Sequence, residues 1–186
     1  MPVAAHPFRP DEVLRSARHR SSVGAGLEDL KKRFYDQSRK WHPDRFSRAG
    51  AAEQTQALEM TATLNDAFRT LRDPVERAEY LLREHGLEPS KNPPPELLEE
   101  VFELNMALEE LREGDESVRA SLVEAQTRFF AMLAHSDAEM NALFGAYDAT
   151  PGAETLGQIR ANLDRRRYIS NLVRDVEKEL HVHTAN

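Results

Sequence analysis

The chain has 186 residues, 40% of them hydrophobic, and its 25 Lys and Arg against 32 Asp and Glu give a net charge of −7. It has no cysteine, which excludes a disulfide framework, a Cys-ligated zinc or iron–sulfur site and a cysteine nucleophile in this chain. The acidic balance disfavours nucleic-acid binding, and neither an 18-residue apolar run nor a secretory signal pattern is present. We therefore expect a soluble, cytoplasmic protein without nucleic-acid or membrane partners.

Apolar residues recur at spacings of three and four from about residue 27 to the end, whereas strand-like alternation is essentially missing. The sequence therefore predicts an all-α fold. Two apolar stripes indicate the first helices, one on Leu27, Leu30, Phe34 and Trp41 and one on Met60, Leu64, Ala67 and Leu71.

Proline residues set the predicted ends of these helices. Pro43 cannot continue a helix and disfavours helical backbone at His42, so the first helix ends near Trp41. Asp73-Pro74 begins a further short helix, with Asp73 as the N-cap and Pro74 at the first position.

A proline-rich segment divides the chain. Gly86 is a predicted helix C-cap, and the four prolines that follow are Pro89, Pro93, Pro94 and Pro95. We expect an N-terminal domain over residues 1–88, a linker over 89–95 and a three-helix bundle over 96–182, followed by a frayed tail at 183–186. The predicted bundle helices cover about 96–113, 116–147 and 151–182, with Thr150 as a cap and Pro151 at the start of the last.

The turn between the first two helices carries His42-Pro43-Asp44. Three residues alone are weak evidence, because Pro-Asp is ordinary turn chemistry and a histidine can cap a helix. The context is more specific, and residues 27–83 together resemble a J-domain. The matching segments are Phe34, Trp41-His42-Pro43-Asp44, Leu64-Asn65-Asp66-Ala67-Phe68, Asp73-Pro74 and Arg77-Ala78-Glu79-Tyr80. Gln37 stands where the J-domain family usually has Leu. Arg15-Ser16 stands where the family has Leu-Gly in an additional helix that precedes the one ending near Trp41.

The J-domain resemblance implies a co-chaperone that docks on a DnaK/HscA-type chaperone ATPase and stimulates its ATP hydrolysis. Catalysis then belongs to the partner, so we expect no enzyme activity, cofactor or metal in this chain. The local charge fits such docking, because residues 27–48 carry seven Lys and Arg against four Asp and Glu. The expected ATPase-binding residues are Lys31, Lys32, Arg39, Lys40, His42, Pro43, Asp44 and Arg45.

The second half of the chain extends the resemblance. A J-domain followed by a proline-containing linker and an acidic helical bundle is similar to the HscB family of iron–sulfur co-chaperones. Further matching segments are Arg77 to Leu82, His85-Gly86, Leu98 to Leu111 and Arg167-Tyr168-Ile169. The family resemblance implies that the bundle binds an iron–sulfur scaffold protein of the IscU type, which carries the cluster in place of this cysteine-free chain.

The helix predicted at 96–113 has two apolar faces. Leu97, Val101, Leu104, Leu108 and Leu111 form one stripe, whereas Leu98, Phe102 and Met106 lie roughly 100° to 180° from it among glutamates. Apolar residues rimmed by charge favour a partner site, although a wide face covered by two neighbouring helices is the alternative. Expected scaffold-binding residues are Leu98, Phe102, Glu103, Met106 and Tyr168, with Tyr168 about 110° from the core side of the last helix.

Other interpretations remain open from the sequence. One is a J-domain protein with an unrelated client, and another is a helical scaffold or nucleic-acid-binding protein in which the HPD turn is incidental. Arg165-Arg166-Arg167 beside Tyr168 is the feature that favours nucleic acid, but seven glutamates on the helix at 96–113 offer these arginines a simpler role in offsetting charge. His181 and His183 supply too few ligands for a metal.

Overall fold

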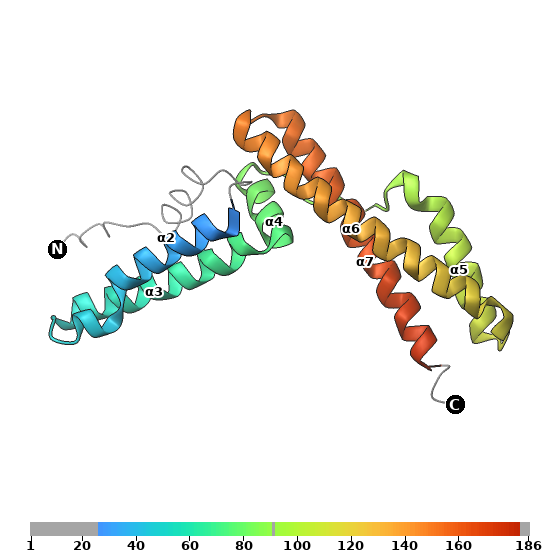
Figure 1. The fold of residues 1–186 in the computed structure, drawn as a ribbon, viewed down its shortest axis with the longest axis horizontal. Coiled ribbons are helices and arrows are strands. Elements are labelled where there is room, and N and C mark those ends of the chain that lie inside the picture. The colour runs from blue at the N-terminus through green and yellow to red at the C-terminus, as the bar shows by residue number, and fades with distance from the viewer. Residues whose placement is uncertain (1–25, 91, 183–186) are drawn as a thin grey trace. The chain divides into compact units, whose positions relative to one another are not determined.

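In a computed structural model, residues 26–90 and 92–182 are described, and within these ranges the chain forms helices and no strand. The elements in order are α2 (Gly26–Trp41), η1 (Pro43–Phe46), α3 (Ala51–Arg72), α4 (Pro74–Glu84), η2 (Pro95–Leu97), α5 (Leu98–Arg112), η3 (Glu116–Val118), α6 (Arg119–Ala149) and α7 (Ala153–Val182) (Figure 1). The all-α prediction is confirmed. No helix in the described ranges has the length and apolar character needed to cross a membrane.

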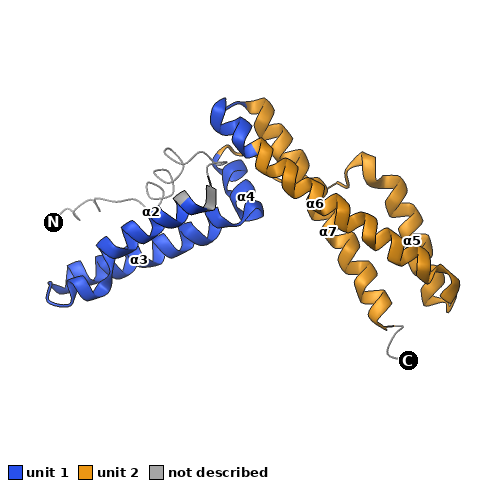
Figure 2. Cartoon of the chain, in the orientation of Figure 1, with its two compact units in different colours: residues 1–84, 144–152 blue, residues 85–143, 153–186 orange. Residues whose placement is uncertain are grey.

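Two compact units make up the chain (Figure 2). The first contains α2, α3 and α4 together with the segment Phe144–Gly152 at the turn between α6 and α7. The second contains α5, the rest of α6, and α7. The segment 1–25, which departs from the J-domain pattern at Arg15-Ser16, and the tail at 183–186 lie outside the described residues, and the division at 89–95 stays a prediction.

Helices α2 and α3 form the antiparallel hairpin of the first unit (Figure 1). Met60 and Leu64 are buried on α3, and Phe34 and Trp41 of α2 pack against them. The ring of Phe34 also stacks on Phe68 with their centroids 4.4 Å apart. Phe34, Trp41, Met60 and Leu64 belong to the stripes that the sequence indicates, and their packing holds the two helices in register.

Helix α4 begins where the sequence predicts. The Asp73 carboxylate accepts hydrogen bonds from the backbone N–H groups of Val75 (2.8 Å) and Glu76 (3.0 Å), and Pro74 occupies the first helical position. Ala78, Leu81 and Leu82 are buried. At the far end, Gly86 has a φ of +67°, the left-handed conformation that favours glycine after a helix.

Arg77 joins α4 to the Phe144–Gly152 segment of the same unit. Its Nε donates to the Leu71 carbonyl at 2.6 Å, and its guanidinium lies 5.2 Å from the centroid of the buried Phe144 ring. Burial lowers the pKa of Arg77, while the charges of Asp148 and Asp73 raise it. A guanidinium stays charged in such surroundings, so the stacked cation fixes how α4 meets this turn.

The second unit is a three-helix bundle with one continuous core. Its buried side chains come from η2, α5, α6 and α7, and they include Leu97, Leu104, Leu108, Leu111, Leu122, Phe129, Ile169, Val173 and Val176. The predicted core stripe of the helix at 96–113 is therefore confirmed, with Val101 packed at its edge. The bundle helices begin two or three residues later than predicted, with α5 starting at Leu98 and α6 at Arg119, each directly after a 3-10 turn. Pro151 and Gly152 precede α7, which begins at Ala153, because the chain uses both residues to reverse direction after Thr150.

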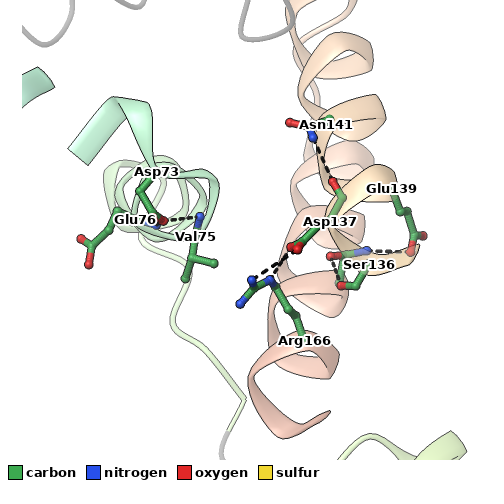
Figure 3. A network of polar contacts seen from close by, with 9 residues as sticks. Asp73, Val75, Glu76, Ser136, Asp137, Glu139, Asn141 and Arg166 are labelled. Atoms are coloured by element: carbon green, nitrogen blue, oxygen red, sulfur yellow. Dashed lines mark hydrogen bonds and ion pairs between the residues drawn. The ribbon is translucent and has the colours of Figure 1, made fainter. Parts of the chain in front are cut away.

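Two polar side chains are buried between α6 and α7. Ser136 and Asn162 are each 1% exposed, and the Ser136 hydroxyl donates to the Asn162 side-chain oxygen at 2.9 Å. The Asn162 amide in turn donates to Glu139 at 2.6 Å (Figure 3). Because an unpaired buried polar group is costly, sliding α7 along α6 by one turn would break this chain of bonds. The network therefore fixes the register of the two long helices.

Gly114 ends α5 in a left-handed conformation and supplies a stability test. Its φ is +99°, and its N–H donates to the Leu111 carbonyl at 3.0 Å. We expect Gly114→Ala to destabilise the protein by about 1 kcal/mol because of backbone strain. The matched control is Gly157→Ala inside α7, where an added Cβ meets nothing within 4 Å and should stabilise by roughly 0.5 to 1 kcal/mol. Urea denaturation measures both, and a Gly114→Ala variant as stable as the parent would contradict the assignment.

Candidate functional site

The loop after α2 is a short, ordered turn centred on His42-Pro43-Asp44. His42 has extended backbone (φ −60°, ψ 128°), and Pro43 opens the 3-10 turn η1. The Asp44 backbone N–H donates to His42 Nδ1 at 3.3 Å. The Arg45 N–H donates to the His42 carbonyl at 3.0 Å. The turn geometry therefore defines the orientation of the imidazole.

Both ionisable side chains of this turn face solvent. The His42 side chain is 59% exposed and that of Asp44 is 91% exposed, with the Asp44 carboxylate 3.6 Å from His42 Nδ1. No residue of η1 is buried. Side chains held in one place without contributing to a core are suited to contact another molecule.

Stacked aromatic side chains on either side of the tripeptide stabilise the turn. Trp41 and Phe46, on either side of the tripeptide, stack with centroids 5.9 Å apart and ring planes 7° from parallel. Thr61 of α3 donates its hydroxyl to the Trp41 carbonyl at 3.1 Å. A surface pocket of about 280 Å³ lies beside this stack, lined by Gln37, Lys40, Trp41 and Phe46. The polar residue at position 37 thus borders the pocket, where the usual leucine of a J-domain would add apolar surface.

The basic residues that the sequence singles out accompany this turn. Lys32, Arg39, Lys40 and Arg45 are exposed, whereas Lys31 is half-buried and pairs with Glu28 at 2.7 Å. Arg45 donates to the Arg39 carbonyl at 3.3 Å, which ties one side chain of the patch to the end of α2. The result is a preformed cationic surface next to an exposed histidine and carboxylate.

The second candidate surface lies on α5, opposite its core stripe. Leu98 is 52% exposed, Phe102 is 68% exposed and Met106 is 48% exposed, although large apolar side chains usually lie inside. Leu104, Leu108 and Leu111 of the same helix are at most 4% exposed. The alternative expectation, a wide face covered by two neighbouring helices, is therefore wrong, and Leu98, Phe102 and Met106 form an open apolar patch.

Glu103 is exposed but lies on another side of α5. With Glu100, Glu124 and Arg128 it lines a groove of about 220 Å³ between α5 and α6. The predicted scaffold-binding residues thus form an apolar patch and an acidic edge next to it, and do not form one continuous cluster.

Tyr168 corrects a prediction. The structure packs it, partly buried, against the core shared by α5, α6 and α7, whereas the helical angle alone placed it clear of the core. The reason is that α7 buries more than one stripe. Asn162, Leu163, Leu172 and Val173 are all buried on it, so the half-buried positions beside them also contact neighbours.

The arginine triplet also has different partners from those expected. Arg165 pairs with Glu139. Arg166 pairs with Asp137 at 2.5 Å (Figure 3). Both acids lie on α6, the helix that packs along α7, so these guanidinium groups serve the bundle and not the glutamates of α5. Among the described residues no cluster of three His, Asp or Glu side chains could hold a metal ion.

The comparisons with known proteins match both halves of the chain. The DnaJ domain family matches residues 20–80, and the family described as the HSCB C-terminal oligomerisation domain matches residues 93–177. Curated relatives described as "Co-chaperone protein HscB homolog" include one from Neisseria gonorrhoeae (strain NCCP11945), 37% identical over 94 residues. Another, from Neisseria meningitidis serogroup C (strain FAM18), is 38% identical over 93 residues. Each alignment covers 48% of this chain and just over half of the relative, 57% and 56% respectively.

A solved structure, "Chaperone HscB from Vibrio cholerae", is similar over 92% of this chain and 96% of its own, with 28% identity and a TM-score of 0.55. The resemblance read from the residues and the similarity of the folded chain therefore agree.

Proposed function

Because the chain belongs to the HscB-type J-domain proteins, we propose that it is a co-chaperone for iron–sulfur cluster assembly. It binds an iron–sulfur scaffold protein of the IscU type and stimulates ATP hydrolysis by a DnaK/HscA-type chaperone. The chain contributes no catalytic group or cofactor of its own, and it works in the cytoplasm. Residues 1–88 serve as the J-domain, 89–95 as the linker and 96–182 as the scaffold-binding bundle.

The exposed His42-Pro43-Asp44 turn is the observation that carries this proposal. It combines a fixed, solvent-facing imidazole and carboxylate with the adjacent cations Lys32, Arg39 and Lys40. This arrangement supports docking on an acidic protein surface, with the cations giving attraction and the turn giving specificity. The hydrolysis itself takes place in the partner.

The apolar patch Leu98, Phe102 and Met106 supports the second half of the proposal. Its flexible and aromatic side chains suit a protein interface, and the chain lacks the cysteines that would hold a cluster itself. A J-domain co-chaperone for another client is the remaining alternative. A pull-down with the purified chain separates the two, because only the proposed function requires a chaperone ATPase and an iron–sulfur scaffold to be recovered together.

We extend the oligomerisation named for the C-terminal family to this chain as well.

Charge reversal tests the cationic surface. We expect Lys40→Glu to raise the concentration needed for half-maximal ATPase stimulation about threefold or more at low salt, because a rim charge steers association. The difference between Lys40→Glu and the parent chain should shrink in about 1 M salt, where charges more than about 3 Å apart are largely screened. Arg69→Glu is the matched control, since Arg69 is an exposed cation on α3 that pairs with Asp66. Equal effects of the two substitutions would show that overall charge, and not this surface, governs binding.

A further inference from the structure

The outward face of α6 is apolar although it lies opposite the bundle core. Val123 and Phe130 are 46% and 48% exposed there. At about 100° per residue they share one face with Thr127 and with exposed alanines at positions 120, 131, 134 and 138. Phe129 and Leu122, on the inner side, are fully buried. The face therefore has no structural role inside the bundle.

The residues along this face complement a second copy of themselves. In an antiparallel pair of identical helices related by a twofold axis at Thr127, residues whose numbers sum to about 254 face each other. Phe130 then meets Val123 of the second copy, and Ala120 meets Ala134. The small residues allow the helix axes to approach within the usual 8 to 10 Å.

The flanking charges fit the same arrangement. Glu124 and Arg128 lie on one side of the face, where both line the groove toward α5. A twofold axis perpendicular to the two antiparallel helices brings this side of one copy next to the same side of the other copy. Glu124 of each copy therefore lies opposite Arg128 of the other. Apolar contacts and opposite charges thus select one register, which an unrelated partner helix would have no reason to match.

We propose that the chain forms a twofold dimer through α6, with Val123, Thr127 and Phe130 at its centre and Glu124 and Arg128 paired across its edge. The proposal rests on the oligomerisation included in the proposed function and identifies the surface through which the two copies associate. A contact between two helices lies at the low end of interface sizes, below about 1,200 Å². We therefore expect association in the micromolar range.

Single cysteines test the register directly, because the parent chain has none. Thr127→Cys places two thiols beside the twofold axis, within the 4.4 to 6.8 Å Cα separation that a disulfide spans. Ala138→Cys, on the same exposed face, places them about 33 Å apart along the helix axis. Under mild oxidation we expect the Thr127→Cys protein to cross-link on the order of ten times faster.

Sedimentation equilibrium of the full chain supplies the second readout. Phe130→Glu should weaken dimerisation about tenfold or more without lowering the thermal midpoint, since the side chain is exposed. Glu124→Arg and Arg128→Glu should each weaken it, and the double variant should restore it.

The possible outcomes distinguish failure of the proposed α6 face from failure of oligomerisation itself. Dimerisation with equal cross-linking at the two positions, or dimerisation unaffected by Phe130→Glu, overturns the α6 face and leaves self-association standing. A chain that stays monomeric into the high micromolar range overturns both, while stimulation of the chaperone ATPase would still be tested independently.

Discussion

His42→Gln should lower the ATPase rate that this chain stimulates in the chaperone about tenfold or more, while leaving the fold intact. The reason is that His42 is exposed and its side chain contacts Asp44 of the same turn, so it contributes to docking and not to the core. Glutamine keeps a polar side chain but loses the oriented ring. The stability cost should stay below about 1 kcal/mol, the usual value of one exposed capping contact. Single-turnover ATP hydrolysis and a thermal melt measure the two quantities.

His135→Gln is the matched control for this substitution. His135 is an exposed histidine on α6, so the same chemical change there should alter neither the stimulated rate nor the thermal midpoint. If His42→Gln retained the stimulation of the parent chain, the turn would not be the docking element.

Phe102→Ala should weaken binding of the iron–sulfur scaffold about tenfold or more, or about 1.4 kcal/mol. Phe102 is 68% exposed at the centre of the apolar patch on α5, so its truncation removes contact area from the partner and little from the core. ATPase stimulation by the J-domain without scaffold should be unchanged. Isothermal titration calorimetry measures the affinity, and urea denaturation measures the free energy of unfolding.

Leu58→Ala is the control, because Leu58 is 59% exposed on α3 in the other unit. It should leave scaffold affinity unchanged. A Phe102→Ala protein that lost about 3 kcal/mol of stability or more would show that Phe102 is a core residue, and the scaffold site would then lie elsewhere.

Tyr168→Ala should also weaken scaffold binding about tenfold, but its effect needs a stability correction. Since the ring packs against the bundle core, truncation removes core contacts as well as any contact with the partner. Phe102 therefore gives the cleaner test, and Tyr168→Phe, which keeps the packed ring, tests whether the hydroxyl matters. If Tyr168→Ala lost stability and kept its affinity, Tyr168 would be a purely structural residue.

The parts of the fold that depend on local signals were predictable from the sequence. Pro43 ends α2 after Trp41, Asp73-Pro74 starts α4, and Gly86 takes the left-handed conformation after it. The two apolar stripes of α5 follow from spacing alone, whereas the choice between an open patch and a face covered by two helices rested on the family resemblance. The spacing thus separated Phe102 from the core stripe, while its exposure and its partner were predicted with the help of the family resemblance.

Features that depend on how helices meet were not predictable in this way. The angle of Tyr168 on its own helix did not reveal that α7 contacts two neighbours. The partners of Arg165 and Arg166 lie on α6 because the Ser136–Asn162 bond sets the register of the two helices. The apolar outer face of α6 was also missed. Its signal is the second set of apolar residues, such as Val123 and Phe130, opposite the core set on a long helix.

The most direct test of the proposed function is the single-turnover ATPase rate of a DnaK/HscA-type chaperone with this chain and the iron–sulfur scaffold, added separately and together. The co-chaperone proposal predicts that the chain alone accelerates hydrolysis and that chain and scaffold together accelerate it more than the product of their separate effects. Hydrolysis that stays at its basal rate with saturating chain, with or without scaffold, would contradict it.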